Sequence, residues 1–144
     1  MKIVRSGSAK WSGGLKDGRG SISTQSGALK AWPYGFASRF ENQTGTNPEE
    51  LIGAAHAACF SMALSKALTD AGYPPTSVET TAAVHLEKVD GAQTVTRIDL
   101  VTTGTAPGID DAEFQKMAEA TKTGCPISRL LAPGTEITLT AKLA

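Results

Sequence analysis

The chain contains two cysteines, and each lies in a context in which a thiol can react. Cys59 lies in an apolar run, Gly53 to Leu64, whose composition predicts part of a long helix. Cys125 precedes Pro126 at the predicted start of a second helix. A thiol at a helix N-terminus faces unpaired N–H groups and the positive end of the helix dipole, and both favour the thiolate. One buried thiol and one activated thiol together suggest a dithiol/disulfide redox pair.

The alternative is that both cysteines are ordinary core residues, because free cysteine is among the most buried residue types. By local sequence Cys125 is the better thiolate candidate, since apolar surroundings raise the pKa of Cys59 unless a cation reaches it. If Cys59 is the nucleophile, the chain must supply that cation. The candidates are the arginines Arg5, Arg19, Arg39, Arg97 and Arg129.

Glu49 falls in the first turn of the predicted long helix, where an acid also stabilises the helix dipole. It precedes Cys59 by ten residues, which is roughly 15 Å along a helix. A role for Glu49 therefore needs an intermediary such as an arginine, or a site assembled from two chains. His56 and Cys59 could share a metal with Cys125, but the spacing matches no recognised metal motif. We expect no metal and no resident cofactor.

The length and composition of the chain predict one domain, residues 1–144, with a sizeable core. The 14 basic and 14 acidic residues balance to a formal net charge of zero, which removes the electrostatic case for nucleic acid or an anionic membrane surface. No apolar signal core follows Met1 to Arg5, and no apolar stretch approaches the ~20 residues that span a bilayer. We expect a soluble cytoplasmic protein, in which paired cysteines are more often redox-active than structural.

The first forty residues predict β structure, with strands near Ser8–Ser12 and Gly20–Thr24 and a short third strand at Phe36–Phe40. A helix is then predicted from Asn47 as N-cap, with Pro48 in the first turn and Glu50 closing a capping box, to about Ala71. Its middle is apolar nearly all round, so it belongs in a core or against a partner.

The second half of the chain predicts a β-hairpin over 78–106 with its turn at Asp90-Gly91, and then a helix that begins near Ile109 and stops at Gly124. A short helix to about Leu131 and a last strand, Glu136–Leu143, complete an α+β fold.

Two segments carry a family resemblance, which extends over the whole chain. The run from Thr46 through Asn-Pro-Glu and Ala-Ala-Cys-Phe to Ala63, followed far downstream by Gly124–Ser128, resembles the OsmC/Ohr family of thiol peroxidases. Three further segments, Ile22–Thr24, Pro33–Phe36 and Pro107–Asp110, are more similar to the OsmC branch than to the Ohr branch.

The resemblance implies an intertwined homodimer with two active sites at the subunit interface, antiparallel sheets and a long buried central helix. It implies that Cys59 is the peroxidatic cysteine and that Cys125 resolves it. Glu49 matches the glutamate of the family's Asn-Pro-Glu motif. The arginine matches Arg39 in the OsmC branch and lies near Arg19 in the Ohr branch, and we choose Arg39.

The expected activity is reduction of organic hydroperoxides, and more weakly of hydrogen peroxide, through a Cys59 sulfenic acid and a Cys59–Cys125 disulfide. An external dithiol would regenerate the pair, and the resemblance suggests lipoyl dithiols for some members. Nearby aromatics, among them Phe36, Phe40 and Phe60, would favour organic substrates. Two alternatives keep the same fold: a stress-induced dimer that binds an apolar ligand without catalysis, and a redox sensor that signals through its disulfide.

Overall fold

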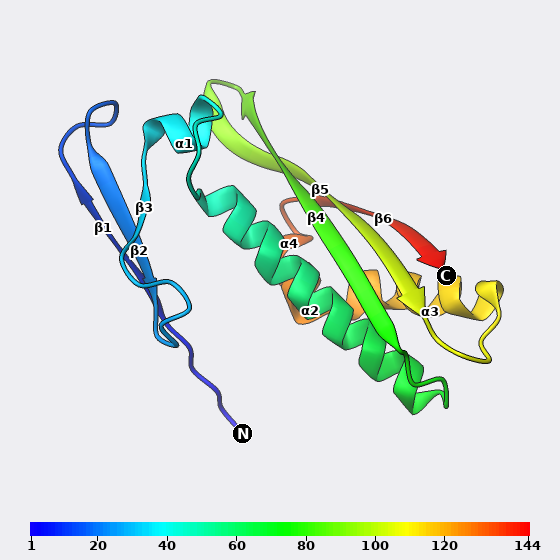
Figure 1. Cartoon of the computed structure of the whole chain (residues 1–144). Helices are drawn as coiled ribbons and strands as arrows, with labels where there is room; N and C mark the ends of the chain where they lie inside the picture. Colours follow the sequence, from blue (N-terminus) through cyan, green and yellow to red (C-terminus); the bar gives the residue numbers. More distant parts are fainter. The chain divides into compact units, whose positions relative to one another are not determined.

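The computed structural model describes all residues 1–144. It divides them into two compact units, Met1–Leu51 and Ile52–Ala144. Each unit contains a three-stranded sheet. The long helix α2 (Pro48–Asp70) contributes its first turn to unit 1 and the rest to unit 2. With its four helices and six strands the chain has an α+β fold (Figure 1).

Unit 1 is built on an antiparallel sheet with the strand order β1-β2-β3. Its strands are β1 (Gly7–Ser12), β2 (Arg19–Thr24) and β3 (Trp32–Tyr34). The first two strands confirm the prediction. The third strand lies upstream of the predicted one.

The predicted strand at Phe36–Phe40 is wrong, because these residues form the helix α1. Ser38 caps this helix, since the Gly35 N–H donates to its Oγ at 3.0 Å. A helix also brings the rings of Phe36 and Phe40 together, with their centroids 5.0 Å apart, whereas residues i and i+4 of a strand lie about 13 Å apart. The local cap and the ring contact therefore favour helix over strand.

The start of α2 follows the predicted N-cap. The Glu50 N–H donates to Asn47 Oδ1 at 2.8 Å, as a capping asparagine requires. The other half of the expected capping box is absent, because the Glu50 carboxylate accepts from Thr46 Oγ1 at 2.6 Å instead. The helix ends at Asp70, one residue before the predicted limit.

Unit 2 contains the predicted hairpin of β4 (Ser77–Val89) and β5 (Ala92–Thr105). Asp90 and Gly91 connect the strands with φ values of 50° and 84°, which a type I′ turn requires. The last strand, β6 (Glu136–Leu143), pairs with β5 in parallel, so this sheet is mixed rather than antiparallel as expected. Parallel pairing follows because the chain returns from β5 to β6 through a helical crossover.

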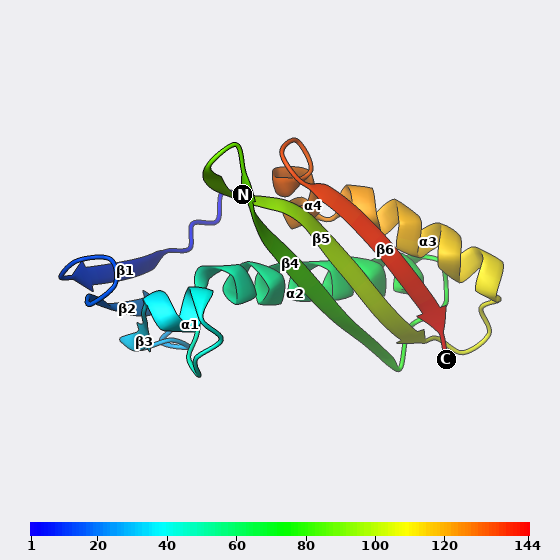
Figure 2. The ribbon, with the colours of Figure 1, turned by 90° about the horizontal axis from the view of Figure 1, so that it is seen from above.

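The crossover consists of α3 (Asp111–Gly124) and α4 (Pro126–Leu131), and together with α2 it builds the core of unit 2. Figure 2 looks through the three strands onto α2 and α3. Besides Cys125, the fully buried apolar side chains of unit 2 come from α2, α3 and the central strand β5: Phe60, Leu64, Leu68, Ile98, Leu100, Phe114 and Ala118.

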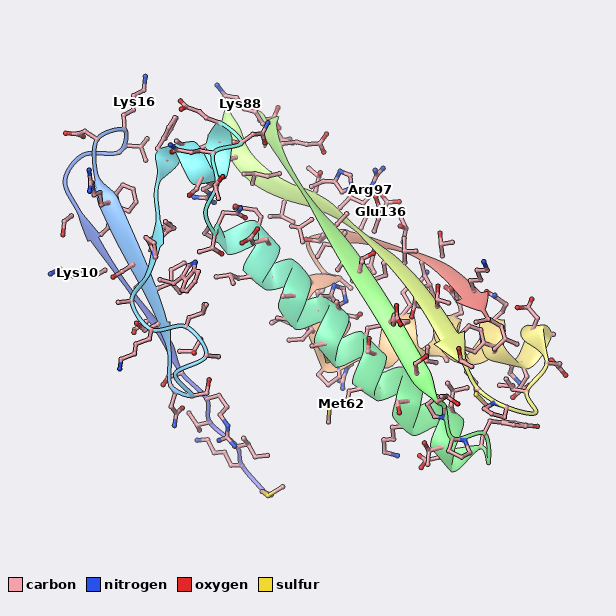
Figure 3. All side chains as sticks on the ribbon, in the orientation of Figure 1. Lys10, Lys16, Met62, Lys88, Arg97 and Glu136 are labelled. Carbon is pink, nitrogen blue, oxygen red and sulfur yellow. The ribbon has the colours of Figure 1, made fainter.

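The helix α2 is buried along one stripe rather than all round. By length and composition alone it could cross a membrane, although we expected no such stretch. Its buried residues, from Gly53 through His56 and Phe60 to Leu68, recur every three or four positions and pack within unit 2, as in the core helix of a soluble fold. Met62 projects from the opposite face of α2 and is 78% exposed (Figure 3).

Candidate active site

Cys59 and Cys125 lie in contact in unit 2. The Cys125 thiol donates to Cys59 Sγ, and the two sulfurs are 3.0 Å apart. Both cysteines are free; Cys59 is half-buried on α2, and Cys125 is fully buried between α3 and α4. The Cys125 N–H donates to Thr121 O at 2.9 Å, which ties this cysteine to the last turn of α3. Since a disulfide has an S–S length of about 2.05 Å, the pair needs an approach of only about 1 Å to close.

The surroundings of Cys59 in unit 2 disfavour its thiolate. Burial raises the pKa of the Cys59 thiol, and the contact with Cys125 raises it further. The backbone N–H of Ile127, in the first turn of α4, acts in the opposite direction and lowers this pKa. The N-terminus of α4 therefore serves Cys59, whereas the sequence suggested that it would activate Cys125. Cys59 still needs a cation to become a good nucleophile.

Arg39 and Glu49 form a two-point ion pair in unit 1. The Arg39 Nε donates to both carboxylate oxygens at 3.1 and 3.2 Å, and Nη2 donates to Oε1 at 2.6 Å. Arg39 lies on α1, not on the predicted strand, and Glu49 lies in the first turn of α2. The pair holds the guanidinium in one orientation, while its Nη1 makes no hydrogen bond and its side chain is 35% exposed. Arg39 can therefore still donate to an anion.

The Arg39 guanidinium opens onto an aromatic hollow of about 280 Å³ in unit 1. It lies 5.1 Å from the ring centroid of Phe40, within the range of a cation–π contact. The other side chains around the hollow are apolar or aromatic: Trp11, Leu15, Tyr34 and Phe36. A cation beside an apolar wall suits a ligand with a polar head and an apolar tail. Phe60, which we expected near the substrate, is instead fully buried in the core of unit 2.

The structure thus groups the four predicted site residues into two pairs, one in each unit. The other candidate arginine, Arg19, lies at the exposed start of β2 and makes no ion pair.

Sequence reasoning also missed one buried contact. His56, considered only as a metal ligand, has its Nε2 2.7 Å from Ser128 Oγ. The available signal was the matching i, i+3 spacing of His56 to Cys59 and of Cys125 to Ser128.

The fold and the site define a class of protein: an α+β protein in which two free thiols meet between two helices packed on a mixed sheet. Sequence comparison agrees with this class, because a family model described as OsmC-like protein matches residues 41–140. The chain belongs to the OsmC family.

Its relatives include two named groups. The chain is 52% identical to Peroxiredoxin OsmC of Escherichia coli (strain K12) over 143 residues, which is 99% of each chain. It is 32% identical to an organic hydroperoxide resistance protein of Xanthomonas axonopodis pv. citri over 97 residues, or 67% of this chain and 66% of that one. Among solved structures, OhrB of Bacillus subtilis matches with a TM-score of 0.71 and 26% identity, covering 95% of this chain and 98% of that one.

Proposed function

We propose that this chain is a thiol peroxidase that reduces organic hydroperoxides through Cys59 and Cys125. The observation that carries the proposal is the 3.0 Å contact between two free thiols, one of them accessible and one buried. Relatives named for peroxiredoxin activity and for hydroperoxide resistance support it.

In the first step the Cys59 thiolate attacks the distal oxygen of R–O–O–H. The O–O bond breaks, the alkoxide leaves and takes up a proton as the alcohol, and Cys59 becomes a sulfenic acid. We assign the role of the cation that Cys59 requires to Arg39, because the Nη1 of Arg39 makes no hydrogen bond. The same guanidinium would stabilise the negative charge that develops on the departing oxygen. Glu49 would hold the guanidinium by its paired hydrogen bonds.

In the second step the Cys125 sulfur attacks the sulfur of the Cys59 sulfenic acid. The S–O bond breaks, a disulfide forms, and the oxygen leaves as water after it accepts the Cys125 proton. An external dithiol then reduces the disulfide by exchange and is itself oxidised, and a lipoyl dithiol is our candidate. No bound cofactor is needed, because hydroperoxide and dithiol balance the electrons.

The preference for organic hydroperoxides rests on the aromatic hollow beside Arg39. An alkyl or aryl group can bury apolar area against Tyr34, Phe36 and Phe40, at roughly 25 cal/mol per Å² removed from water. Hydrogen peroxide has no such group, so it is expected to be the poorer substrate.

We also propose that the working enzyme is a cytoplasmic homodimer. Unit 1 builds almost no core of its own, since Thr46 is its only buried residue, while Ile3, Val4 and Trp32, which lie outside the aromatic hollow, remain exposed. A second copy that covers these residues would supply the missing burial. Light scattering coupled to gel filtration gives the mass: about twice 14.9 kDa supports the dimer, and a monomer at micromolar concentration rejects it.

Turnover assays test the catalytic proposal. The reduced protein is mixed with dihydrolipoamide and either cumene hydroperoxide or hydrogen peroxide, and peroxide loss is followed. We expect faster turnover of cumene hydroperoxide and no turnover by Cys59→Ser. Oxidation of the pair without turnover by any dithiol would instead indicate a redox sensor, and no oxidation at all would indicate a binding protein.

A further inference from the structure

A second contact joins α2 to α4 beside the two sulfurs. His56 Nε2 and Ser128 Oγ lie 2.7 Å apart, and Cys59 Sγ and Cys125 Sγ lie 3.0 Å apart. His56 comes three residues before Cys59, and Ser128 comes three residues after Cys125. The earlier residue on α2 thus meets the later residue on α4, so the two helices run antiparallel with the contacts one turn apart.

The His56–Ser128 contact lies wholly inside the protein. His56 is 0% exposed and Ser128 is 1% exposed, and no Asp, Glu, Lys or Arg is among the buried side chains. His56 Nδ1 has no hydrogen-bond partner. Burial lowers the pKa of His56, which favours the neutral imidazole. Two apolar residues would fill this space without leaving a ring nitrogen unpaired, so stability alone does not account for the polar pair.

Two backbone contacts already hold the start of α4, from the Cys125 N–H to Thr121 O and from the Ile127 N–H to Cys59. The His56–Ser128 hydrogen bond adds a directional side-chain contact to them. This helix has six residues, and its Pro126, Arg129 and Leu130 are exposed. Ile127 packs against the core, but apolar contacts are not directional. A hydrogen bond weakens steeply as its angle departs from linearity. Together with the Ile127 N–H, Ser128 therefore sets the rotation of α4 about its own axis, and this rotation carries the Cys125 side chain.

We infer that the His56–Ser128 hydrogen bond positions Cys125 for its attack on oxidised Cys59. This inference rests on the proposed function and deepens its second step. In that step the sulfurs must close from 3.0 Å to about 2.05 Å, along the line of the breaking S–O bond. Because misplacement by about 1 Å can cost about 100-fold in rate, the orientation of α4 controls disulfide formation. His56 and Ser128 are thus positioning residues that leave the reaction of Cys59 with peroxide unchanged.

Single-turnover kinetics separate the two steps. Sulfenic acid formation is followed with a dimedone-type trap, and disulfide formation is followed by the loss of two thiols. We expect Ser128→Ala to slow disulfide formation by about tenfold or more, with sulfenic acid formation unchanged. Ser128→Thr keeps the hydroxyl and should restore most of the rate.

The matched control is Thr102→Val, which removes another buried hydroxyl from unit 2. Thr102 is fully buried on β5 and hydrogen-bonds Thr80 Oγ1 and Glu79 O, so it makes no link between α2 and α4. Its loss should lower stability without slowing disulfide formation.

A redox titration provides a readout that needs no peroxide. Ser128→Ala should lower the effective concentration of Cys125 at Cys59, and a tenfold fall shifts the potential of the pair by about 30 mV toward easier reduction. The potential of Thr102→Val should stay at the wild-type value. If the wild-type protein forms no sulfenic acid with any hydroperoxide, the proposed function fails, and the titration still decides the positioning role.

The double variant His56→Leu/Ser128→Ala separates positioning from packing. It leaves no unpaired polar atom at the contact, so its stability should exceed that of Ser128→Ala alone. Its disulfide formation should nevertheless stay slow, because the directional link is gone. A wild-type rate of disulfide formation in either variant would overturn the inference. Equal slowing of both chemical steps, with no rescue by Ser128→Thr, would also overturn it.

Discussion

The close packing of α2 against the sheet depends on Gly53. This dependence leads to a specific prediction about stability. A Cβ at this position would lie 2.7 Å from the carbonyl oxygen of Ala82 on β4 and 3.5 Å from Val84 Cγ2. The first distance is 0.7 Å short of an ordinary 3.4 Å contact. Its partner is backbone in the middle of a sheet, which cannot swing away as a side chain can. The substitution Gly53→Ala therefore forces α2 off the sheet or distorts β4.

Two opposing terms set the size of the effect. Alanine is the better helix former by about 1 kcal/mol, while overpacking a well-filled core costs about 1–3 kcal/mol. Because the clash is with backbone, we place the cost near the upper end and expect a net loss of about 1–2 kcal/mol. For a chain of this size that loss lowers the Tm by about 2–8 °C.

Gly124 provides the matched control, since it is also helical but has nothing within 4 Å of an added Cβ. Gly124→Ala should be neutral or should gain up to about 1 kcal/mol. Thermal and urea unfolding of the reduced protein, followed by far-UV circular dichroism, would measure both variants. If Gly53→Ala is as stable as the wild type, or if the two substitutions have equal effects, the close approach of α2 to β4 does not limit this position.

Three further predictions concern the thiols and the buried histidine. Cys125→Ser should let Cys59 accumulate as a sulfenic acid after one equivalent of peroxide, seen by trapping and mass; no adduct would argue against attack by Cys59. Arg39→Ala should raise the Cys59 pKa, measured from the pH dependence of alkylation, and an unchanged pKa would move the cation elsewhere. Burial lowers the pKa of His56 below its usual 6.5. As pH falls below 6.5, His56 therefore binds a proton more readily in the unfolded chain than in the folded chain. Stability should therefore be full above pH 6.5 and decline toward pH 5, by at most about 1.4 kcal/mol per pH unit, and His56→Leu should remove this slope in urea unfolding.

Elements with strong local signals were predicted well from the sequence. The Asn47 cap and the apolar run located α2, and Asp90-Gly91 located the hairpin turn, because both signals act within a few residues. The segment Phe36–Phe40 was mistaken for a strand, since its helix depends on the Ser38 cap and one ring contact. The parallel pairing of β6 was also missed, because local sequence does not reveal which strand it will meet.

By itself the sequence determined the family, the positions of the long helix and of the two thiols, and the residue types available for peroxide chemistry. The tertiary structure decided which of these residues meet. It brought Cys125 to Cys59 across 66 positions, directed the Ile127 N–H to Cys59, and paired His56 with Ser128. The physical reason is that helix starts and turns are set by short-range hydrogen bonds. Contacts between α2 and α4 depend instead on how the whole crossover packs against the sheet, which no local pattern records.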